Sequence, residues 1–528
     1  MVNLKINNKE ISVPDGTSVM KAAEQAGEKI PALCWHEELE HFTSCMVCLV
    51  KDASNGKLLA SCSVKAADGM EIITEDDEVR EGRRTALELL LSEHVGDCEA
   101  PCTLSCPAHM DIPEMNRLIA QGDFEEALHV VLQDIAIPTV LGYICPAPCE
   151  GACHRKTIDE AVSICLLKRF AGEKAGEKVF RNIQAAPYNG KKVAVIGSGP
   201  AGLAAAFYLQ LRGYASTIFE KESNAGGMLR TEIDDNKLPK EVLDTEIARI
   251  LSTGVKLKTG VSVGEDLFRE LKKDFDAMVI ASGQITDMQK SWGLQINPKG
   301  LDADKNTYQT SETGIFAVGN VLRPSRLAVR SAGLGKEVAF SVDQYLQNKP
   351  VRGEPGIFNS RFGKLIQQEF AEYLKESVDR KRVWPDDSAK GRGFSPEEAV
   401  SEAERCLHCD CRKQDDCKLR DFSEEYKAVQ RRFFFGERRN ITKNYNHDLV
   451  VYEPQKCIKC GICVRLTKKY GERFGFTFIG RGFDVTIGVP FNEELQEGLE
   501  VAARKVAEGC PTGALAIKKA EAKETGPK

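Results

Sequence analysis

Nineteen cysteines gather in short groups, and these groups constrain the fold of this 528-residue chain more than any other feature. Long stretches between the groups contain no cysteine, as in residues 166–405. The first residues, MVNLKINNKEISVPDG, contain no apolar export signal, and structural disulfides seldom persist in proteins that are not exported. Thiolates that hold metal clusters explain the grouping better than free buried cysteines. We therefore expect most of the cysteines to be metal ligands.

Length and charge narrow the class of protein. A chain of 528 residues is too long for one hydrophobic core, and its 42% hydrophobic residues are enough to fill several. The net charge of −6 gives no general basic footprint for nucleic acid. No apolar run is long enough to span a membrane. We expect a cytoplasmic multidomain protein with no nucleic-acid partner and no membrane span.

The first cysteine group has the pattern C-x10-C-x2-C-x13-C, formed by Cys34, Cys45, Cys48 and Cys62. It follows LKINNKEISVPDGTSVMKAAEQAG, which predicts a hairpin and then a helix. This spacing is typical of a plant-type [2Fe-2S] site, and a structural zinc site is the alternative. The region resembles the ferredoxin-like N-terminal domain of the large iron-sulfur subunit of respiratory complex I and of multimeric hydrogenases. The resemblance implies a β-grasp [2Fe-2S] domain over residues 1–80.

The second region begins with LELLLSEHVGDC, which resembles the complex I family as far as Cys98. From CPAHMDIP onward it resembles the N-terminal domain of the glutamate synthase small subunit, a helical domain that carries two [4Fe-4S] clusters. We place this domain at residues 81–185. Its candidate ligands are the seven cysteines Cys98, Cys102, Cys106, Cys145, Cys149, Cys153 and Cys165.

Seven thiolates cannot fill two sites of four ligands each, so we expect His94 to be the eighth ligand. The alternative is that His94 is an ordinary surface or core residue. The division of the eight stays open at this point. His94, Cys98, Cys102 and Cys106 could share one cluster, or the two runs of cysteines could interleave.

The C-terminal region, residues 397–528, holds two further groups. Cys406, Cys409, Cys411 and Cys417 are crowded enough to predict one metal centre. The second group combines Cys457, Cys460 and Cys463 with a remote Cys510-Pro, and it resembles a bacterial ferredoxin [4Fe-4S] site whose loop has been lengthened by an insertion. The chain is thus predicted to hold one [2Fe-2S] and four [4Fe-4S] clusters.

Between these regions lies the pattern of a dinucleotide-binding fold. An apolar strand leads into Gly197, Gly199 and Gly202, a helix follows, and a second strand ends at Glu220. The glycines permit a tight turn, the helix N-terminus faces a pyrophosphate, and the carboxylate takes ribose hydroxyls. The pair Gly226 and Gly227 is common in flavoproteins with two dinucleotide-binding domains.

Two later segments, FDAMVIASG and TGIFAVGNVLRP, resemble the FAD-domain motifs of the glutamate synthase family. In that family a whole NAD(P)H domain separates them, whereas about thirty residues do so here. We predict an FAD-type Rossmann domain over residues 186–350 that lacks the NAD(P) insert, with Gly319 and Asn320 standing where the family has Gly-Asp. An empty Rossmann scaffold is the alternative. Residues 351–396, which include RFGKLIQQEFAEYLKESV, are predicted to be a helical connector.

The predicted fold class is therefore multidomain, combining α/β and α+β domains, with no catalytic residue assigned. The mixed resemblance implies an electron-transfer subunit of a soluble electron-bifurcating hydrogenase. The implied partners are an NADH/FMN-binding complex I-like subunit, a small thioredoxin-like [2Fe-2S] subunit, hydrogenase subunits and ferredoxin. The alternatives are the equivalent subunit of a bifurcating formate dehydrogenase or transhydrogenase, a standalone glutamate synthase-like oxidoreductase, and a zinc-rich scaffold.

Overall fold

The chain separates into two compact units that each combine non-contiguous segments. The computed structural model describes residues 1–40, 42–385, 391–434 and 436–518. Unit 1 is made of Met1–Glu99, Gly356–Lys375 and Cys409–Lys528, and unit 2 of Ala100–Pro355 and Glu376–His408. Both contain helices and strands, so the prediction of a multidomain chain of mixed structure is confirmed.

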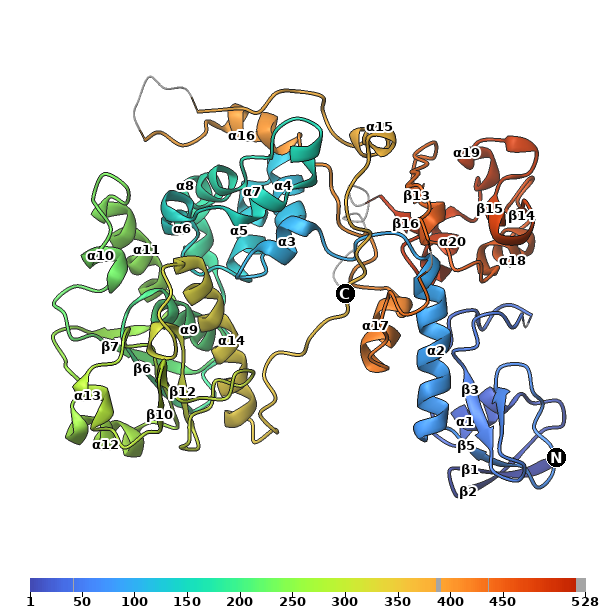
Figure 1. Cartoon of the computed structure of the whole chain (residues 1–528), viewed down its shortest axis with the longest axis horizontal. Helices are drawn as coiled ribbons and strands as arrows, with labels where there is room; N and C mark the ends of the chain where they lie inside the picture. The colour runs from blue at the N-terminus through green and yellow to red at the C-terminus, as the bar shows by residue number, and fades with distance from the viewer. Residues whose placement is uncertain (41, 386–390, 435, 519–528) are drawn as a thin grey trace. The chain divides into compact units, whose positions relative to one another are not determined.

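Unit 1 begins with a five-stranded sheet and one helix (Figure 1). Its elements are β1 (Val2–Ile6), β2 (Lys9–Val13), α1 (Val19–Gln25), β3 (Leu49–Asp52), β4 (Lys57–Ala60) and β5 (Glu71–Ile73). The strand order is β2-β1-β5-β3-β4, with β1 parallel to β5 and the other pairs antiparallel. Alternation along β1 buries Val2, Leu4 and Ile6 in the core that α1 covers. The predicted hairpin and helix are confirmed.

A long helix, α2 (Asp77–Glu93), connects this sheet to His94. Asp76 caps its N-terminus by accepting a hydrogen bond from the backbone N–H of Val79. The buried guanidinium of Arg83 donates to the carbonyl oxygen of Leu49 on β3. The helix stops at His94, whose backbone is extended. These bonds fix the point at which His94 leaves the helix.

The C-terminal part of unit 1 contains short helices and two strand pairs. Its elements are α17 (Lys418–Glu425), β13 (Val450–Tyr452), η4 (Pro454–Lys456), α18 (Ile462–Lys469), β14 (Thr477–Ile479), β15 (Thr486–Gly488), α19 (Leu495–Gly498), α20 (Ala503–Gly509) and β16 (Leu515–Ile517). β13 pairs with β16 and β14 with β15, both antiparallel. The β14–β15 hairpin and α19 occupy the predicted insertion between Cys463 and Cys510.

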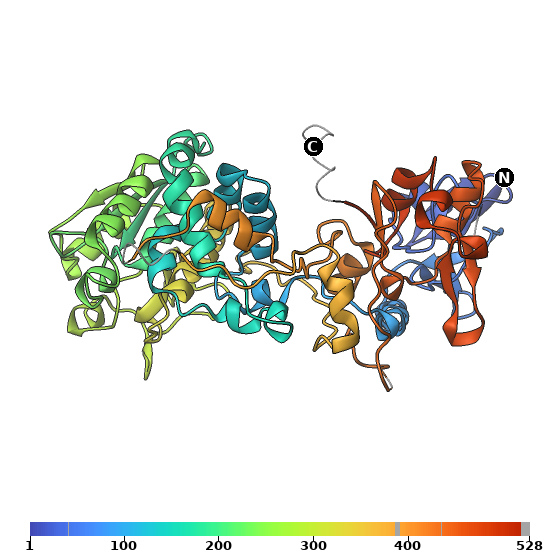
Figure 2. The same cartoon turned by 90° about the horizontal axis from the view of Figure 1, so that it is seen from above.

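Unit 2 contains a group of helices that comes mainly from residues 100–182. They are α3 (Pro101–Ser105), α4 (Ile112–Ala120), α5 (Phe124–Leu132), α6 (Pro138–Ile144), α7 (Pro148–Ala152) and α8 (Ile164–Asn182). α8 packs against α5 and α6, and α3 packs against α7. α16 (Pro396–Ala403), from much later in the chain, packs against α4, and the two views agree on this (Figure 2).

The rest of unit 2 is a parallel sheet of five strands with helices. The strands are β6 (Lys192–Ile196), β7 (Ala215–Phe219), β8 (Lys256–Lys258), β9 (Ala277–Ile280) and β12 (Ile315–Ala317), in the order β12-β9-β6-β7-β8. The helices are α9 (Pro200–Leu211), α10 (Met228–Thr231), α11 (Lys240–Ser252), α12 (Glu265–Asp274) and α14 (Ala328–Leu346). Residues 281–314, all described, hold α13 (Asp287–Lys290) and the small β10 (Ile296–Asn297) and β11 (Gly300–Leu301) pair.

The prediction of a helical connector over residues 351–396 is largely wrong. The segment expected to be one helix forms only the turn η3 (Gln367–Glu369) and α15 (Phe370–Leu374). The backbone N–H of Phe362 donates to Asp97, and Gly363 has a φ of +97°. Tertiary hydrogen bonds and this left-handed residue compete with helix formation. Residues 386–390 of the predicted connector lie outside the described residues.

Candidate metal centres and dinucleotide site

The four N-terminal cysteines form one connected group of thiols. Cys34, Cys45, Cys48 and Cys62 are all buried, and the Sγ atoms of Cys48 and Cys62 are 3.0 Å apart. Hydrogen bonds from Cys45 and Cys62 hold the pKa of Cys34 well below its ordinary value. The bond to Cys62 lowers the pKa of Cys48 to about 7. Because thiolates are the ligands of iron, this group has the donors that the sequence spacing predicts.

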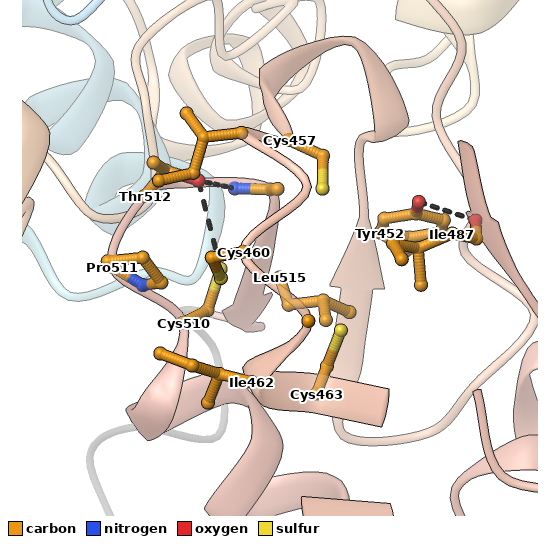
Figure 3. A pocket seen from close by; sticks show the side chains of 13 residues that line it. Tyr452, Cys457, Cys460, Ile462, Cys463, Ile487, Cys510, Pro511, Thr512 and Leu515 are labelled. Atoms are coloured by element: carbon orange, nitrogen blue, oxygen red, sulfur yellow. Dashed lines mark hydrogen bonds between the residues drawn. The ribbon is translucent and has the colours of Figure 1, made fainter. Parts of the chain in front are cut away.

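The C-terminal group surrounds a small cavity that is shown in Figure 3. Cys457, Cys460, Cys463 and Cys510 line it together with apolar side chains such as Leu515. Burial raises the pKa of Cys457 to about 11, and the neighbouring Cys510 thiol adds to this effect. Four thiols around an apolar space fit the donor set and the shielding that a [4Fe-4S] cluster requires.

A site for a single metal ion needs several ligand side chains close to one point. In the described part of the chain, no group of three or more His, Cys, Asp or Glu side chains could hold a metal ion. The thiols of the C-terminal group instead stand around a cavity.

In unit 2, four thiols lie around one buried lysine. Lys168 on α8 is 3% exposed. Burial alone would lower its pKa, but the thiols of Cys165, Cys145, Cys106 and Cys149 raise the pKa above its ordinary value. Cys165 is hydrogen-bonded to both Cys145 and Cys149. The structure therefore brings Cys106 together with the second cysteine run, which corresponds to the interleaved alternative.

The predicted single centre at Cys406, Cys409, Cys411 and Cys417 is wrong as a grouping, because contacts divide this run. Cys406 lies in unit 2, where burial raises the pKa of its thiol to about 11 and where Asn116 and Cys153 are its neighbours. The preceding residue, Arg405, is fully buried and pairs with Glu402 at 2.8 Å and with Asp159 at 3.1 Å. These ion pairs hold the chain before Cys406 within unit 2. Cys102, on α3, belongs to the same unit.

The later two cysteines of the run lie in unit 1 beside Cys98. The backbone N–H of Cys411 donates to the carbonyl oxygen of Cys98 at 3.0 Å. Burial raises the pKa of Cys417 to about 12, with the thiols of Cys411 and Cys98 contributing. Cys409 is also in unit 1 and interacts with the phenol of Tyr373.

His94 lies in the same neighbourhood of unit 1. Its Nδ1 is 3.1 Å from the carbonyl oxygen of Lys456. Burial lowers the pKa of His94 to about 4, and the Lys456 ammonium acts in the same direction. The imidazole is therefore neutral at pH 7, with Nδ1–H donating to this carbonyl. Its Nε2 then carries the free lone pair.

The dinucleotide pattern lines a cavity of about 300 Å³ beside the parallel sheet. Of the predicted residues, the cavity is lined by Gly197, Gly199, Glu220, Gly227 and Asn320. Gly202 and Gly226 do not line the cavity but are required by the backbone. A Cβ on Gly202 would lie 2.0 Å from the carbonyl oxygen of Gly197, and Gly226 has a φ of +126°.

Glu220 is already engaged at the cavity wall. Its Oε2 accepts hydrogen bonds from the backbone N–H of Ser198 at 2.9 Å and from the Ser198 hydroxyl at 2.5 Å. Oε1 accepts from the N–H of Glu222 at 2.9 Å. Asn320, which also lines the cavity, is held by the N–H of Ser325, which donates to its Oδ1 at 3.0 Å. Both side chains are held in place, which favours a preformed site.

Sequence reasoning missed three residues of these sites. Lys168 and Lys456 are the buried cations beside the thiols, and Trp292 lines the dinucleotide cavity while stacking on Phe268 at 4.8 Å. The position of Lys456, directly before Cys457, is a signal that the sequence offers. Nothing in the spacing marks Lys168 or Trp292.

Comparison with protein families supports the same three kinds of domain. Residues 1–77 match the 2Fe-2S iron-sulfur cluster binding domain. Residues 75–179 match domain II of dihydropyrimidine dehydrogenase, a 4Fe-4S cluster domain. Residues 195–258 match the NAD(P)-binding Rossmann-like domain.

Several curated proteins are similar to part of the chain. The NADPH-Fe(3+) oxidoreductase subunit beta of Geobacter sulfurreducens is 36% identical over 245 residues, which are 45% of this chain and 34% of that protein. The NADP(+)-dependent formate dehydrogenase subunit beta of Moorella thermoacetica is 40% identical over 207 residues, covering 35% and 29%. The glutamate synthase [NADPH] small chain of Bacillus subtilis is 38% identical over 183 residues, covering 34% and 37%.

The chain thus spans about a third of the length of these relatives. Among solved structures, an NAD+-reducing [NiFe]-hydrogenase aligns over 98% of this chain and 88% of its own, but with a TM-score of 0.35 and 13% identity this likeness carries no argument. None of the helices in the described residues has the length and apolar character of a membrane crossing. The chain combines a 2Fe-2S cluster binding domain, a 4Fe-4S cluster domain and a Rossmann-like nucleotide-binding domain.

Proposed function

We propose that this chain is an iron–sulfur electron-transfer subunit of a multisubunit oxidoreductase. The observation that carries the proposal is the succession of thiol groups within unit 1. The thiols of Cys34 and Cys460 interact with each other, and those of Cys417 and Cys510 do so as well. The C-terminal cavity group therefore lies between the N-terminal group and the group that contains Cys417.

Clusters bound to these thiolates would supply one-electron storage and transfer. The protein's contribution is to bury the thiols, to exclude water and to hold neighbouring groups close together. Arg465 illustrates this role, since its Nη2 donates to the carbonyl oxygens of Cys34 at 3.3 Å and of Cys460 at 3.5 Å. A guanidinium that bridges two cysteine loops keeps them at a constant separation.

The ligand assignment follows these groups. Cys34, Cys45, Cys48 and Cys62 would hold [2Fe-2S], while Cys457, Cys460, Cys463 and Cys510 would hold one [4Fe-4S] cluster and Cys106, Cys145, Cys149 and Cys165 another. The other candidate ligands are numerous enough for two more [4Fe-4S] clusters. The total would be one [2Fe-2S] and four [4Fe-4S] clusters.

The nucleotide cavity is proposed to bind FAD. Its support is the large cavity with Gly199 and Asn320 on its lining. Residues 281–314 hold a short helix and a two-stranded hairpin where the glutamate synthase family has an NAD(P)H domain. Hydride exchange with NAD(P)H would then take place on a partner subunit.

The terminal module that we favour is an electron-bifurcating hydrogenase. Its NADH/FMN-binding subunit and small [2Fe-2S] subunit would exchange electrons with this chain, as would ferredoxin and the hydrogenase subunits. The support is the mixed resemblance of the sequence at Cys98 and CPAHMDIP. The second candidate is a bifurcating formate dehydrogenase. Its support is the 40% identity over 207 residues between this chain and a formate dehydrogenase beta subunit.

A direct test compares two electron donors on the chain purified without oxygen. Dithionite should reduce the chain and produce the EPR signals of both cluster types. NADH or NADPH alone should leave these signals absent and should not drive reduction of a viologen dye. Rapid dye reduction by NADPH with the isolated chain would contradict the proposal and favour a standalone oxidoreductase.

A further inference from the structure

We infer that His94, Cys98, Cys411 and Cys417 form one iron–sulfur site assembled from two distant parts of the chain. The inference rests on the proposed function, and it assigns ligands that sequence spacing groups differently. All four residues belong to unit 1.

Backbone hydrogen bonds hold the two parts together. The N–H of Cys411 donates to the carbonyl oxygen of Cys98, and the N–H of Cys98 donates to the carbonyl oxygen of Ser360 at 3.2 Å. The N–H of Ser360 donates back to the Sγ of Cys98 at 3.4 Å. An N–H directed at sulfur stabilises the thiolate form that iron requires.

The loop from Pro511 to Gly513 packs closely against the thiols of Cys411 and Cys417. A Cβ on Gly513 would lie 2.2 Å from the Sγ of Cys411, so a glycine is needed at this position. The Sγ of Cys417 is 3.8 Å from the carbonyl oxygen of Pro511. The Cys417 thiol in turn interacts with those of Cys411 and Cys98.

His94 has the arrangement that metal-bound histidines usually adopt. Such residues commonly donate one ring N–H to a backbone carbonyl, which fixes the tautomer and leaves the other nitrogen for the metal. Here Nδ1 meets the carbonyl oxygen of Lys456 at 3.1 Å. With Nδ1 engaged by this carbonyl, Nε2 is the ring nitrogen left to bind a metal.

Lys456 interacts electrostatically with three of the four residues. Lys456 is 4% exposed, and its ammonium interacts with His94, Cys98 and Cys411. Its stem packs against Gly96, where a Cβ would come within 2.7 Å of the lysine. Glu453 accepts from the ammonium at 2.7 Å. A buried cation beside the two thiolates of Cys98 and Cys411 offsets part of the cost of burying their charge.

The same lysine connects this site to the C-terminal cavity. Its carbonyl oxygen accepts hydrogen bonds from His94 and from the hydroxyl of Thr512, the latter at 3.1 Å. Thr512 lines the cavity and is 3.7 Å from the Sγ of Cys510. A short route of hydrogen bonds thus joins the imidazole to a ligand of the neighbouring group.

An imidazole in place of a thiolate makes a cluster less negative and raises its reduction potential. The His94 site would therefore accept electrons more readily than an all-thiolate site in the same surroundings. This property suits a site that stores an electron at the end of the series formed by the N-terminal group, the C-terminal cavity group and the group that contains Cys417.

The ligand set is tested with Cys98→Ser, Cys411→Ser and Cys417→Ser in the full chain, with Cys406→Ser as the matched control. Iron content and EPR spectra are recorded for each variant after anaerobic purification. We expect the first three variants to lose or alter one and the same EPR signal, and the control to alter another. A shared signal for Cys411→Ser and Cys406→Ser would overturn the inference.

His94 is tested by pulsed EPR, which detects a nitrogen nucleus bound directly to a cluster. Wild-type protein should show a strong nitrogen coupling that His94→Cys loses, accompanied by a lower midpoint potential of that cluster. His129→Gln, on α5, should keep the coupling. Iron-replete wild-type protein without the coupling would overturn the inference alone, whereas protein without iron would overturn the proposed function as well.

Discussion

Cys34 and Cys460 lie next to each other in unit 1, and the carbonyl oxygens of both accept hydrogen bonds from the same guanidinium nitrogen of Arg465. The two thiols also interact electrostatically. One residue thereby joins the loop of the N-terminal group to the loop of the C-terminal group. Clusters held at these two loops would be close enough to influence each other magnetically.

Arg465→Met tests the importance of this bridge. Removal of the guanidinium should weaken the contact between the loops, so the broadening of the reduced [2Fe-2S] EPR signal by its neighbour should decrease. Arg481→Met, at an exposed position, should leave the line shape unchanged. An unchanged spectrum in Arg465→Met would show that the bridge does not set the separation.

Lys168 should raise the reduction potential of the cluster that we propose at Cys106, Cys145, Cys149 and Cys165. Its buried ammonium lies beside these thiols, and reduction adds negative charge that a nearby cation stabilises. Lys168→Met should lower the potential by about 60 mV, which corresponds to tenfold in the equilibrium for one electron.

Lys168→Arg keeps the positive charge and serves as the control for that experiment. Its potential should stay near the wild-type value in an EPR-monitored redox titration, at equal iron content. A similar decrease in both variants would mean that packing, and not charge, sets the potential.

Gly199→Ala should reduce flavin binding without disturbing the fold. A Cβ at this position meets no atom within 4 Å, yet it would project at the cavity wall where a pyrophosphate approaches the helix N-terminus. We expect retention of flavin to weaken at least ~10-fold, or ~1.4 kcal/mol, as measured by flavin released per chain. Gly264→Ala, which also has open space, should retain wild-type flavin.

Glu246 should make the stability of unit 2 depend on pH. It is fully buried on α11, and burial raises its pKa from 4.5 to about 7 even though Thr139 and Val140 donate to it at 2.7 Å. The folded state therefore binds a proton that the unfolded state releases at lower pH. The free energy of unfolding should decrease as the pH rises from about 4.5 to about 7, by on the order of 3 kcal/mol.

Glu246→Gln should remove most of this dependence, because an amide does not titrate. Unfolding followed by circular dichroism at several pH values measures the effect, and Glu241→Gln on the exposed face of the same helix is the control. Parallel pH profiles for Glu246→Gln and wild type would contradict the prediction.

Local spacing was sufficient to predict which cysteines lie together when they are close in sequence. Cys457 and Cys460 lie just before α18, and Cys463 lies in its first turn. Because the three are close in sequence, they line the same cavity. The glycine pattern around Gly197 worked for the same reason, since strand, turn and helix are contiguous.

Spacing could not divide the run from Cys406 to Cys417, because the division depends on tertiary contacts. Buried ion pairs of Arg405 retain Cys406 in unit 2, whereas a backbone hydrogen bond to Cys98 places Cys411 in unit 1. Two cysteines five residues apart thus have different neighbours. The helix predicted after Arg361 failed similarly, because Asp97 and Gly363 impose another backbone path.

The most direct test of the electron-transfer function is to measure iron, sulfide, zinc and flavin per chain after anaerobic purification. One [2Fe-2S] and four [4Fe-4S] clusters require about eighteen irons and a matching amount of sulfide, and the cavity beside Gly199 predicts about one flavin. Stoichiometric zinc with little iron or sulfide would contradict the electron-transfer function.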